Sequence, residues 1–94
     1  ILGRLAKWNS AIGVLNKAVA VSPDAVDYTN LGWAYYNAAK IDAENKREAE
    51  SKSKLALGKA VLQKAIAMNS PNKIIQAGAF MNLGVTLSEL KEFQ

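Results

Sequence analysis

The sequence predicts an all-α fold, a solenoid of helical hairpins with about four helices. Two observations lead to this prediction. First, two interleaved motifs each occur twice: residues 15–23 return as 62–71, with one residue inserted before the Ser-Pro pair, and residues 28–35 return as 80–87. Second, apolar residues within these motifs recur every three or four positions, which is the spacing of one helix face. Solenoids are usually binding surfaces, so the repeats favour an interaction role over catalysis.

Two apolar stripes at helical spacing define the first two helices. The first helix should end at Ser22-Pro23, because proline disfavours helical conformation in the residue before it. Within the second stripe lies Gly32, which costs a helix about 1 kcal/mol relative to alanine, so we expect a close contact with a neighbouring helix there. Gly58 and Gly84 are expected to serve packing in the same way. The stripes are Ala11, Leu15, Ala18 and Val21, then Tyr28, Leu31, Tyr35 and Ala38.

Two larger sets of residues recur along the chain. They are Tyr28, Leu31, Gly32 and Tyr35 with Phe80, Leu83, Gly84 and Leu87, and Ala11, Leu15, Ala18 and Pro23 with Gly58, Leu62, Ala65 and Pro71. These sets resemble the first and second helices of the tetratricopeptide repeat, a hairpin of about 34 residues. The resemblance implies a right-handed superhelical array of antiparallel helix hairpins. Residues 1–23 would be the second helix of one repeat, 24–71 a complete repeat and 72–94 the first helix of the next, so we interpret the chain as part of a longer protein.

The central repeat is longer than the family pattern. The interval from Pro23 to Pro71 exceeds the period of the repeat by about 14 residues, which corresponds to about four helical turns. Because whole turns preserve the packing face, we expect each helix of the central hairpin to be about two turns longer. The tip of the hairpin should then lie near Asn45 to Glu48, where Asn45 could adopt the left-handed conformation that ends a helix, although asparagine is a weaker stop than glycine.

The inserted segment Lys40–Lys54 is almost entirely polar, so we expect a solvated helical extension with charge pairs four residues apart. One alternative is a dedicated partner-binding arm. Another follows from the lack of a strong helix breaker between Ala34 and Gly58: one uninterrupted helix from about Asp27 to Met68, exchanged between two chains as a swapped dimer. The expected charge pairs are Asp42 with Lys46, Glu48 with Lys52 and Glu50 with Lys54.

The composition argues against an enzyme and against a cofactor or metal site. The 94 residues include no cysteine and no histidine, so the chain lacks thiolate nucleophiles, cysteine ligands and the commonest general base. Twelve Lys and Arg against eight Asp and Glu give a formal net charge of +4, which permits an acidic partner but does not indicate nucleic acid. No apolar run reaches the length of about 18 to 20 residues that a membrane span needs. The sequence does not determine the cellular compartment of the protein, although the cytoplasm is favoured.

Tetratricopeptide proteins bind extended or helical peptides in a concave groove lined by first helices, so the resemblance implies a protein–protein interaction scaffold. Asn30 and Asn82 occupy the same place, one residue before each Leu-Gly pair. An amide there can donate to and accept from a peptide backbone, while Trp33 and Tyr36 would supply apolar contact area. The expected groove residues are Asn30, Trp33, Tyr36, Asn37, Met81, Asn82 and Val85, with Thr29, Ser88 and Glu89 beside them.

These groove residues also have structural alternatives. Asn30 and Asn82 could hydrogen-bond a neighbouring helix instead of a ligand, and Trp33 could be covered, together with Tyr36, by a further repeat. Some family members carry lysines that clamp a C-terminal carboxylate one position before these asparagines. Thr29 and Met81 occupy those positions here, so a carboxylate clamp is not expected.

Nucleic-acid binding by the inserted hairpin is the alternative function, since other helical repeats bind RNA. Acidic residues interleave with the basic ones and nearly cancel the local charge, which argues against it. We also expect apolar residues on the two end helices, namely Trp8, Ile12, Phe80 and Phe93, to permit self-association. The basic residues of the hairpin are Lys46, Arg47, Lys52, Lys54 and Lys59.

Overall fold

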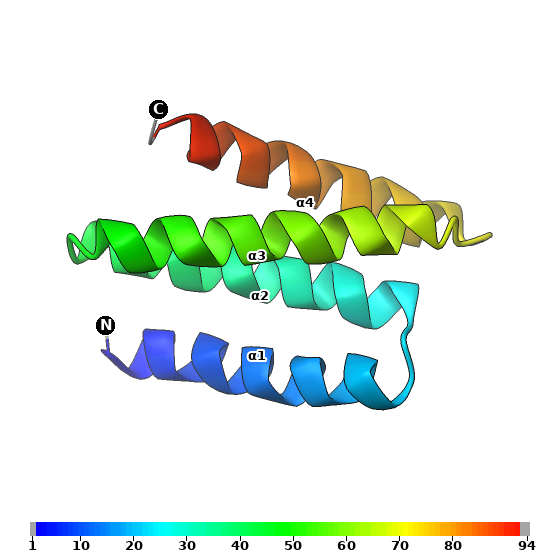
Figure 1. Cartoon of the computed structure of the whole chain (residues 1–94), viewed down its shortest axis with the longest axis horizontal. Coiled ribbons are helices and arrows are strands. Elements are labelled where there is room, and N and C mark those ends of the chain that lie inside the picture. Colours follow the sequence, from blue (N-terminus) through cyan, green and yellow to red (C-terminus); the bar gives the residue numbers. More distant parts are fainter. Residues whose placement is uncertain (1, 93–94) are drawn as a thin grey trace.

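A computed structural model describes residues 2–92, which form four α-helices and no strand. The helices are α1 (Leu2–Val21), α2 (Ala25–Glu44), α3 (Glu48–Ala67) and α4 (Lys73–Lys91). Successive helices run antiparallel and are joined by short turns (Figure 1). The prediction of an all-α fold is therefore confirmed.

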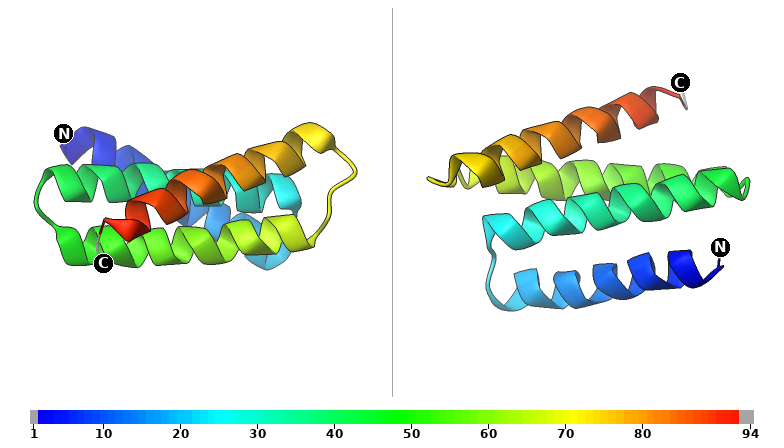
Figure 2. Two further views of the ribbon diagram at one scale, coloured as in Figure 1. Left: turned by 90° about the horizontal axis from the view of Figure 1, so that it is seen from above. Right: turned by 180° about the vertical axis from the view of Figure 1, so that it is seen from behind.

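The hairpin of α2 and α3 is the centre of the molecule. α1 contacts α2, and α4 contacts both α3 and α2. Seen from above, α4 crosses obliquely over the hairpin, while α1 lies on the opposite side (Figure 2). The most deeply buried apolar side chains come from the hairpin and include Leu31, Ile41, Leu55 and Leu62. The core therefore lies between α2 and α3, with an outer helix on either side.

Polar side chains fix where α2 and α4 begin. Asp24 follows the Ser22-Pro23 pair, and its carboxylate accepts hydrogen bonds from two backbone N–H groups of the first turn of α2, at 2.8 and 3.4 Å. Asn72 follows the second Ser-Pro pair and caps α4 in the same way, at 3.0 and 3.4 Å. Caps of this kind contribute about 1 kcal/mol each. The repeated Ser-Pro signals thus separate the helices as the sequence predicted.

Two glycines allow α2 and α3 to approach closely. A Cβ added at Gly32 would lie 2.5 Å from Cδ2 of Leu62, which is fully buried. A Cβ added at Gly58 would lie 3.2 Å from Cβ of Tyr35. The close contact expected at Gly32 is confirmed. Gly84 does not fit the same expectation, because a Cβ added there meets no atom within 4 Å: no described helix covers that side of α4.

The hairpin turns at residues 45–47, inside the tip that the sequence predicts. The residue in the left-handed conformation is Lys46, with φ of 61°, and not Asn45. Asn45 has φ of −100°, and its Nδ2 donates to the backbone oxygen of Ile41 at 2.8 Å. Since the helix ends here, one uninterrupted helix over residues 27–68 is not what this structure contains.

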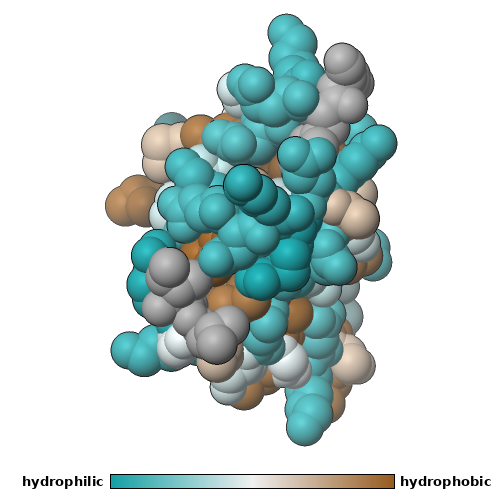
Figure 3. Space-filling model, turned by 90° about the vertical axis from the view of Figure 1, so that its left-hand side faces the viewer, coloured by the Kyte–Doolittle hydropathy of each residue, from teal (hydrophilic) through white to brown (hydrophobic). Residues whose placement is uncertain are grey.

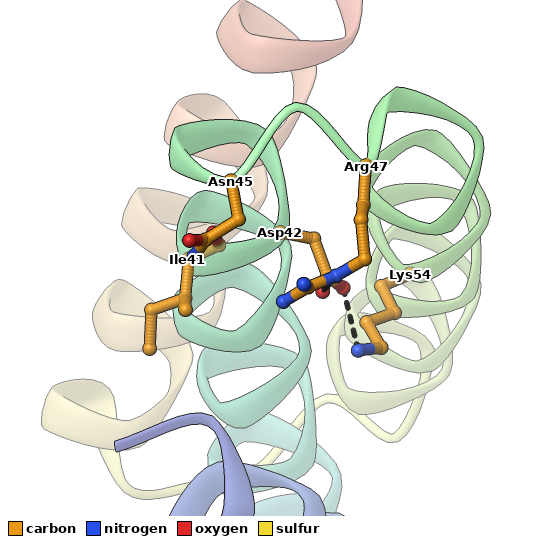
Figure 4. A network of polar contacts seen from close by, with 5 residues as sticks. All are labelled: Ile41, Asp42, Asn45, Arg47 and Lys54. Atoms are coloured by element: carbon orange, nitrogen blue, oxygen red, sulfur yellow. Dashed lines mark hydrogen bonds and ion pairs between the residues drawn. The ribbon is translucent and has the colours of Figure 1, made fainter. Parts of the chain in front are cut away.

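A buried carboxylate holds this turn against α3 (Figure 4). Asp42 is 1% exposed. Its Oδ1 accepts a hydrogen bond from Nε of Arg47 at 2.9 Å, and its Oδ2 accepts one from Nζ of Lys54 at 2.6 Å. The backbone N–H of Arg47 also donates to the backbone oxygen of Asp42 at 2.8 Å. Two cations, one from the turn and one from α3, therefore converge on one carboxylate of α2.

This network corrects two expectations for the inserted segment. The pairing of Asp42 with Lys46 was wrong, as were the other pairs four residues apart, because both ion pairs within residues 2–92 involve Asp42. The segment is also not fully solvated, since Ile41, Asp42 and Ser51 are buried. Small side chains such as Ser51 keep α2 and α3 in contact up to the tip. Only the outer surface is left to water, and this end of the molecule is mostly hydrophilic (Figure 3).

Apolar side chains also lie on the outer helices. Phe80 on α4 is exposed, whereas Trp8 and Ile12 on α1 are half-buried, so the expectation of apolar exposure is met fully at Phe80 and in part on α1. Phe93 lies outside the described residues.

The glycine contacts predict opposite effects for one substitution at two sites. Gly32→Ala should lower the free energy of unfolding by about 2 kcal/mol, because the new Cβ overlaps the buried Leu62 side chain. Gly84→Ala should raise it by up to about 1 kcal/mol, because alanine favours the helix and the space is open. Urea unfolding followed by circular dichroism at low protein concentration measures both. Equal effects at the two sites would contradict the close approach of α2 and α3.

The buried network predicts that Asp42→Asn lowers the free energy of unfolding by about 1–3 kcal/mol, because the partly buried cations of Arg47 and Lys54 lose their counter-charge. Glu44→Gln is the matched control, since it removes an exposed carboxylate from the same helix and should change stability by less than about 0.5 kcal/mol. A comparable loss in both variants, measured by urea unfolding, would assign the effect to net charge rather than to the buried site.

Candidate functional site: a groove between the second and fourth helices

The groove lies where α4 crosses α2, and it has a volume of about 420 Å³. Its walls come from one helix of the central hairpin and from the last helix of the chain, which contact each other directly. Apolar and amide side chains line it together. The lining residues are Asn30 and Trp33 from α2, with Gly78, Met81, Asn82 and Val85 from α4.

Five of the seven residues predicted for a peptide groove lie together here. Tyr36 and Asn37 do not line the groove but contact Trp33. The Tyr36 ring stacks on the Trp33 ring with centroids 5.4 Å apart and planes 21° apart. Nδ2 of Asn37 donates to the backbone oxygen of Trp33 at 2.8 Å. The Tyr36 ring therefore supports the position of the indole from outside the groove, whereas Asn37 bonds only the backbone of α2.

The side chains of Trp33, Tyr36 and Lys40 contact one another in a row along α2. Lys40 lies one turn beyond Tyr36, and its Nζ is 5.6 Å from the centroid of the Tyr36 ring. Cation–ring and ring–ring contacts of this kind restrict side-chain rotation and so reduce the entropy that a bound ligand must remove. Trp33 nevertheless stays 42% exposed, and Met81 across the groove is 67% exposed. Large apolar side chains held in place but open to solvent are typical of binding surfaces.

The chain matches no protein-family model, no curated protein and no solved structure.

The two repeat-equivalent amides, Asn30 and Asn82, are not used internally. Neither side chain makes a hydrogen bond with any residue in the range 2–92, so the alternative in which they bond a neighbouring helix is not observed. The neighbouring hydroxyls are already engaged: Oγ1 of Thr29 donates to the backbone oxygen of Ala25 at 2.7 Å, and Oγ1 of Thr86 donates to that of Asn82 at 2.8 Å. Both amides are thus polar groups of this groove that a ligand can reach.

The groove also contains a residue that the sequence reasoning missed. Gly78 has no side chain to fill the space beside α2, and a Cβ added there would be 4.0 Å from Cγ2 of Thr29. A signal was present in the sequence, because Gly78, Asn82 and Val85 recur at the three-and-four spacing of one helix face. Two outer residues of the predicted groove lie elsewhere: Ser88 lies beside Lys59 of α3, and Glu89 lies in a cavity near the tip of the hairpin.

The basic residues of the hairpin, which carry the nucleic-acid alternative, are only partly available. Arg47 and Lys54 both bond the buried carboxylate of Asp42, with side chains 36% and 21% exposed. Lys46 and Lys52 are exposed, and Lys59 is half-buried. Two of the five basic side chains that could contact phosphates are therefore already paired with a carboxylate inside the molecule.

No group of three or more Asp and Glu side chains within residues 2–92 is placed to hold a metal ion. No helix in that range combines the length and apolar character needed to cross a bilayer.

Proposed function

We propose that this chain is a tetratricopeptide-type interaction scaffold that binds an extended segment of a partner protein in the α2–α4 groove. The observation that carries the proposal is the pair of equivalent amides, Asn30 and Asn82, which line one groove and have no internal partner. They are contributed by the two copies of the same motif. A peptide that hydrogen-bonds both amides would be recognised through its backbone, since each amide can donate and accept a hydrogen bond at once.

The apolar side chains supply the second part of the interaction. Trp33 would be the main anchor, because exposed tryptophans held in a fixed position dominate binding energy at many interfaces. Met81 and Val85 form the opposite wall, and methionine adapts to ligands of different shape. The partner segment we propose is therefore an extended peptide with at least one large apolar residue between stretches that are recognised by their backbone.

The arrangement of the helices supports the family part of the proposal. α2 and α4, which carry the same motif, contact each other, and α4 also contacts α3. Each helix of a repeat array packs against its neighbours in this way. We propose on this basis that the four helices form part of a superhelical array in which α2 and α4 line the concave side.

Selection from a phage-displayed library of random peptides, followed by fluorescence anisotropy with the selected peptides, tests the groove. Trp33→Ala should weaken binding by at least about tenfold, and Asn30→Ala/Asn82→Ala by about fivefold or more. Phe80→Ala is the matched control, because Phe80 is an exposed aromatic residue of α4 that does not line the groove. Peptides that lose affinity with Phe80→Ala but not with Trp33→Ala would place the binding site elsewhere and contradict the proposal.

Nucleic-acid binding is separated from peptide binding by its salt dependence. A labelled poly-uridine RNA should bind weakly at low salt and lose that binding near physiological salt, because phosphate contacts release counterions and few cations are available here. Lys46→Ala/Lys52→Ala removes two exposed lysines near the tip of the hairpin and should not affect peptide binding. RNA affinity that persists at physiological salt and falls in this variant would favour the nucleic-acid function over the groove.

A further inference from the structure

A second cavity follows the α2–α4 groove toward the tip of the hairpin. It has a volume of about 370 Å³ and lies where the end of α4 faces the parts of α2 and α3 nearest the turn. We call it the tip cavity. Charged side chains from all three helices line it: Lys40 of α2, Glu48 of α3, and Glu89 and Glu92 at the end of α4.

The charge of the tip cavity is opposite to that of the chain. Three carboxylates line it with a single ammonium group, whereas the chain as a whole has a formal net charge of +4. None of the three carboxylates forms an ion pair in the part of the chain that the structure describes. The ammonium group, that of Lys40, lies over the Tyr36 ring instead. The tip cavity therefore has an excess of negative charge that no described residue neutralises.

Two of the carboxylates lie where a helix disfavours them. Glu89 is in the last turn of α4, and Glu92 caps its C-terminus. The carbonyl groups at this end of a helix carry partial negative charge, so an acidic side chain is destabilising there. Lys91 belongs to the same turn but lies on the outer side of α4. Glu48, in contrast, lies in the first turn of α3, where a helix attracts a carboxylate. A cation bound in the tip cavity would offset the repulsion at Glu89 and Glu92.

A buried hydroxyl group in the tip cavity also lacks a partner. Ser51 lines the cavity and is 1% exposed. Its backbone N–H donates to the backbone oxygen of Arg47 at 3.0 Å, but its hydroxyl makes no hydrogen bond with any residue in the range 2–92. Buried polar groups are normally hydrogen-bonded, because leaving one without a partner costs free energy. The tip cavity thus offers a neutral acceptor together with its carboxylates.

We propose that the tip cavity binds an arginine side chain of the partner peptide, an inference that rests on the peptide-binding function proposed above. A guanidinium group has five N–H donors in one plane and no acceptor. It can therefore bond the carboxylates of Glu89 and Glu92 and the hydroxyl of Ser51 at the same time. A lysine ammonium is a compact charge with three donors, so it reaches fewer of these acceptors at once. The expected preference is for arginine over lysine.

The spacing of the two cavities predicts the spacing of residues in the peptide. α2 and α4 run in the same direction, since successive helices are antiparallel (Figure 1). Along α2 the groove residue Trp33 and the cavity residue Lys40 are about two turns apart, as are Val85 and Glu92 along α4. Two helical turns rise about 10 Å, whereas an extended peptide advances about 3.3 Å per residue. The arginine should therefore lie about three positions from the large apolar residue that contacts Trp33.

The tip cavity is separate from the place that a following helix would take in the proposed array. Such a helix would pack on α4 as α3 packs on α2, where Leu62 covers Gly32. The equivalent position on α4 is Gly84, which lies in a hollow that shares no lining residue with the tip cavity. A further helix packed at Gly84 would therefore not occupy the tip cavity.

Fluorescence anisotropy with the phage-selected peptides tests the arginine site. Peptides that depend on Trp33 should carry an arginine about three positions from a large apolar residue. Citrulline has the shape of arginine without its charge, so this replacement should weaken binding by at least about fivefold, as should Glu89→Gln/Glu92→Gln. Glu44→Gln/Glu50→Gln is the matched control, because it removes two exposed carboxylates outside the tip cavity and should leave the affinity unchanged. Peptides that depend on Trp33 but bind equally well with citrulline would overturn the arginine site and leave the groove proposal standing.

A small cation tests the tip cavity without any peptide. N-acetyl-arginine amide, titrated into the isotope-labelled 94-residue chain, should shift the backbone amide resonances of Ser51 and Glu89 to saturation at millimolar concentrations, and N-acetyl-citrulline amide should not. Ser51→Ala should weaken this binding by about threefold while circular dichroism shows unchanged helices. Absent shifts, equal shifts with citrulline, or shifts that persist in Glu89→Gln/Glu92→Gln would overturn the arginine site. Saturable arginine binding without any Trp33-dependent peptide would instead contradict the groove proposal alone.

Discussion

The close approach of α2 and α3 is the constraint on which the rest of the structure depends. It requires a glycine on each helix, because Gly32 receives Leu62 and Gly58 receives the stem of Tyr35. Tyr35 then extends past α3 to α1, where its hydroxyl accepts a hydrogen bond from Nδ2 of Asn16 at 3.1 Å. The side chain of Tyr35 thus connects α2 to both α3 and α1. With the hairpin closed, α4 can rest on both of its helices at once, and the α2–α4 groove results from that position.

The buried carboxylate of Asp42 settles a choice that propensity alone leaves open. No glycine or proline stops the helix between α2 and α3, and the left-handed turn residue is a lysine. A single long helix would separate Asp42 from Lys54 by three turns, whereas the hairpin brings Nζ of Lys54 within 2.6 Å of its Oδ2. A buried ion pair need not add much net stability, but an unpaired buried charge is strongly disfavoured. Within a single chain the network therefore favours the hairpin, because one straight helix would keep Lys54 away from Asp42.

Much of the fold could be predicted from the sequence because repeats and Ser-Pro signals are local patterns. These patterns predict the all-α class and the turns before α2 and α4. They also predict the close contact at Gly32 and the position of the hairpin tip. The buried state of Asp42 could not be predicted in this way, because its partners Arg47 and Lys54 come from the turn and from the opposite helix. The rule that charges four residues apart pair along one helix instead favoured Lys46 as the partner of Asp42. In the candidate site, repeat equivalence identified Asn30 and Asn82, whereas the role of Gly78 required the crossing of α4 over α2.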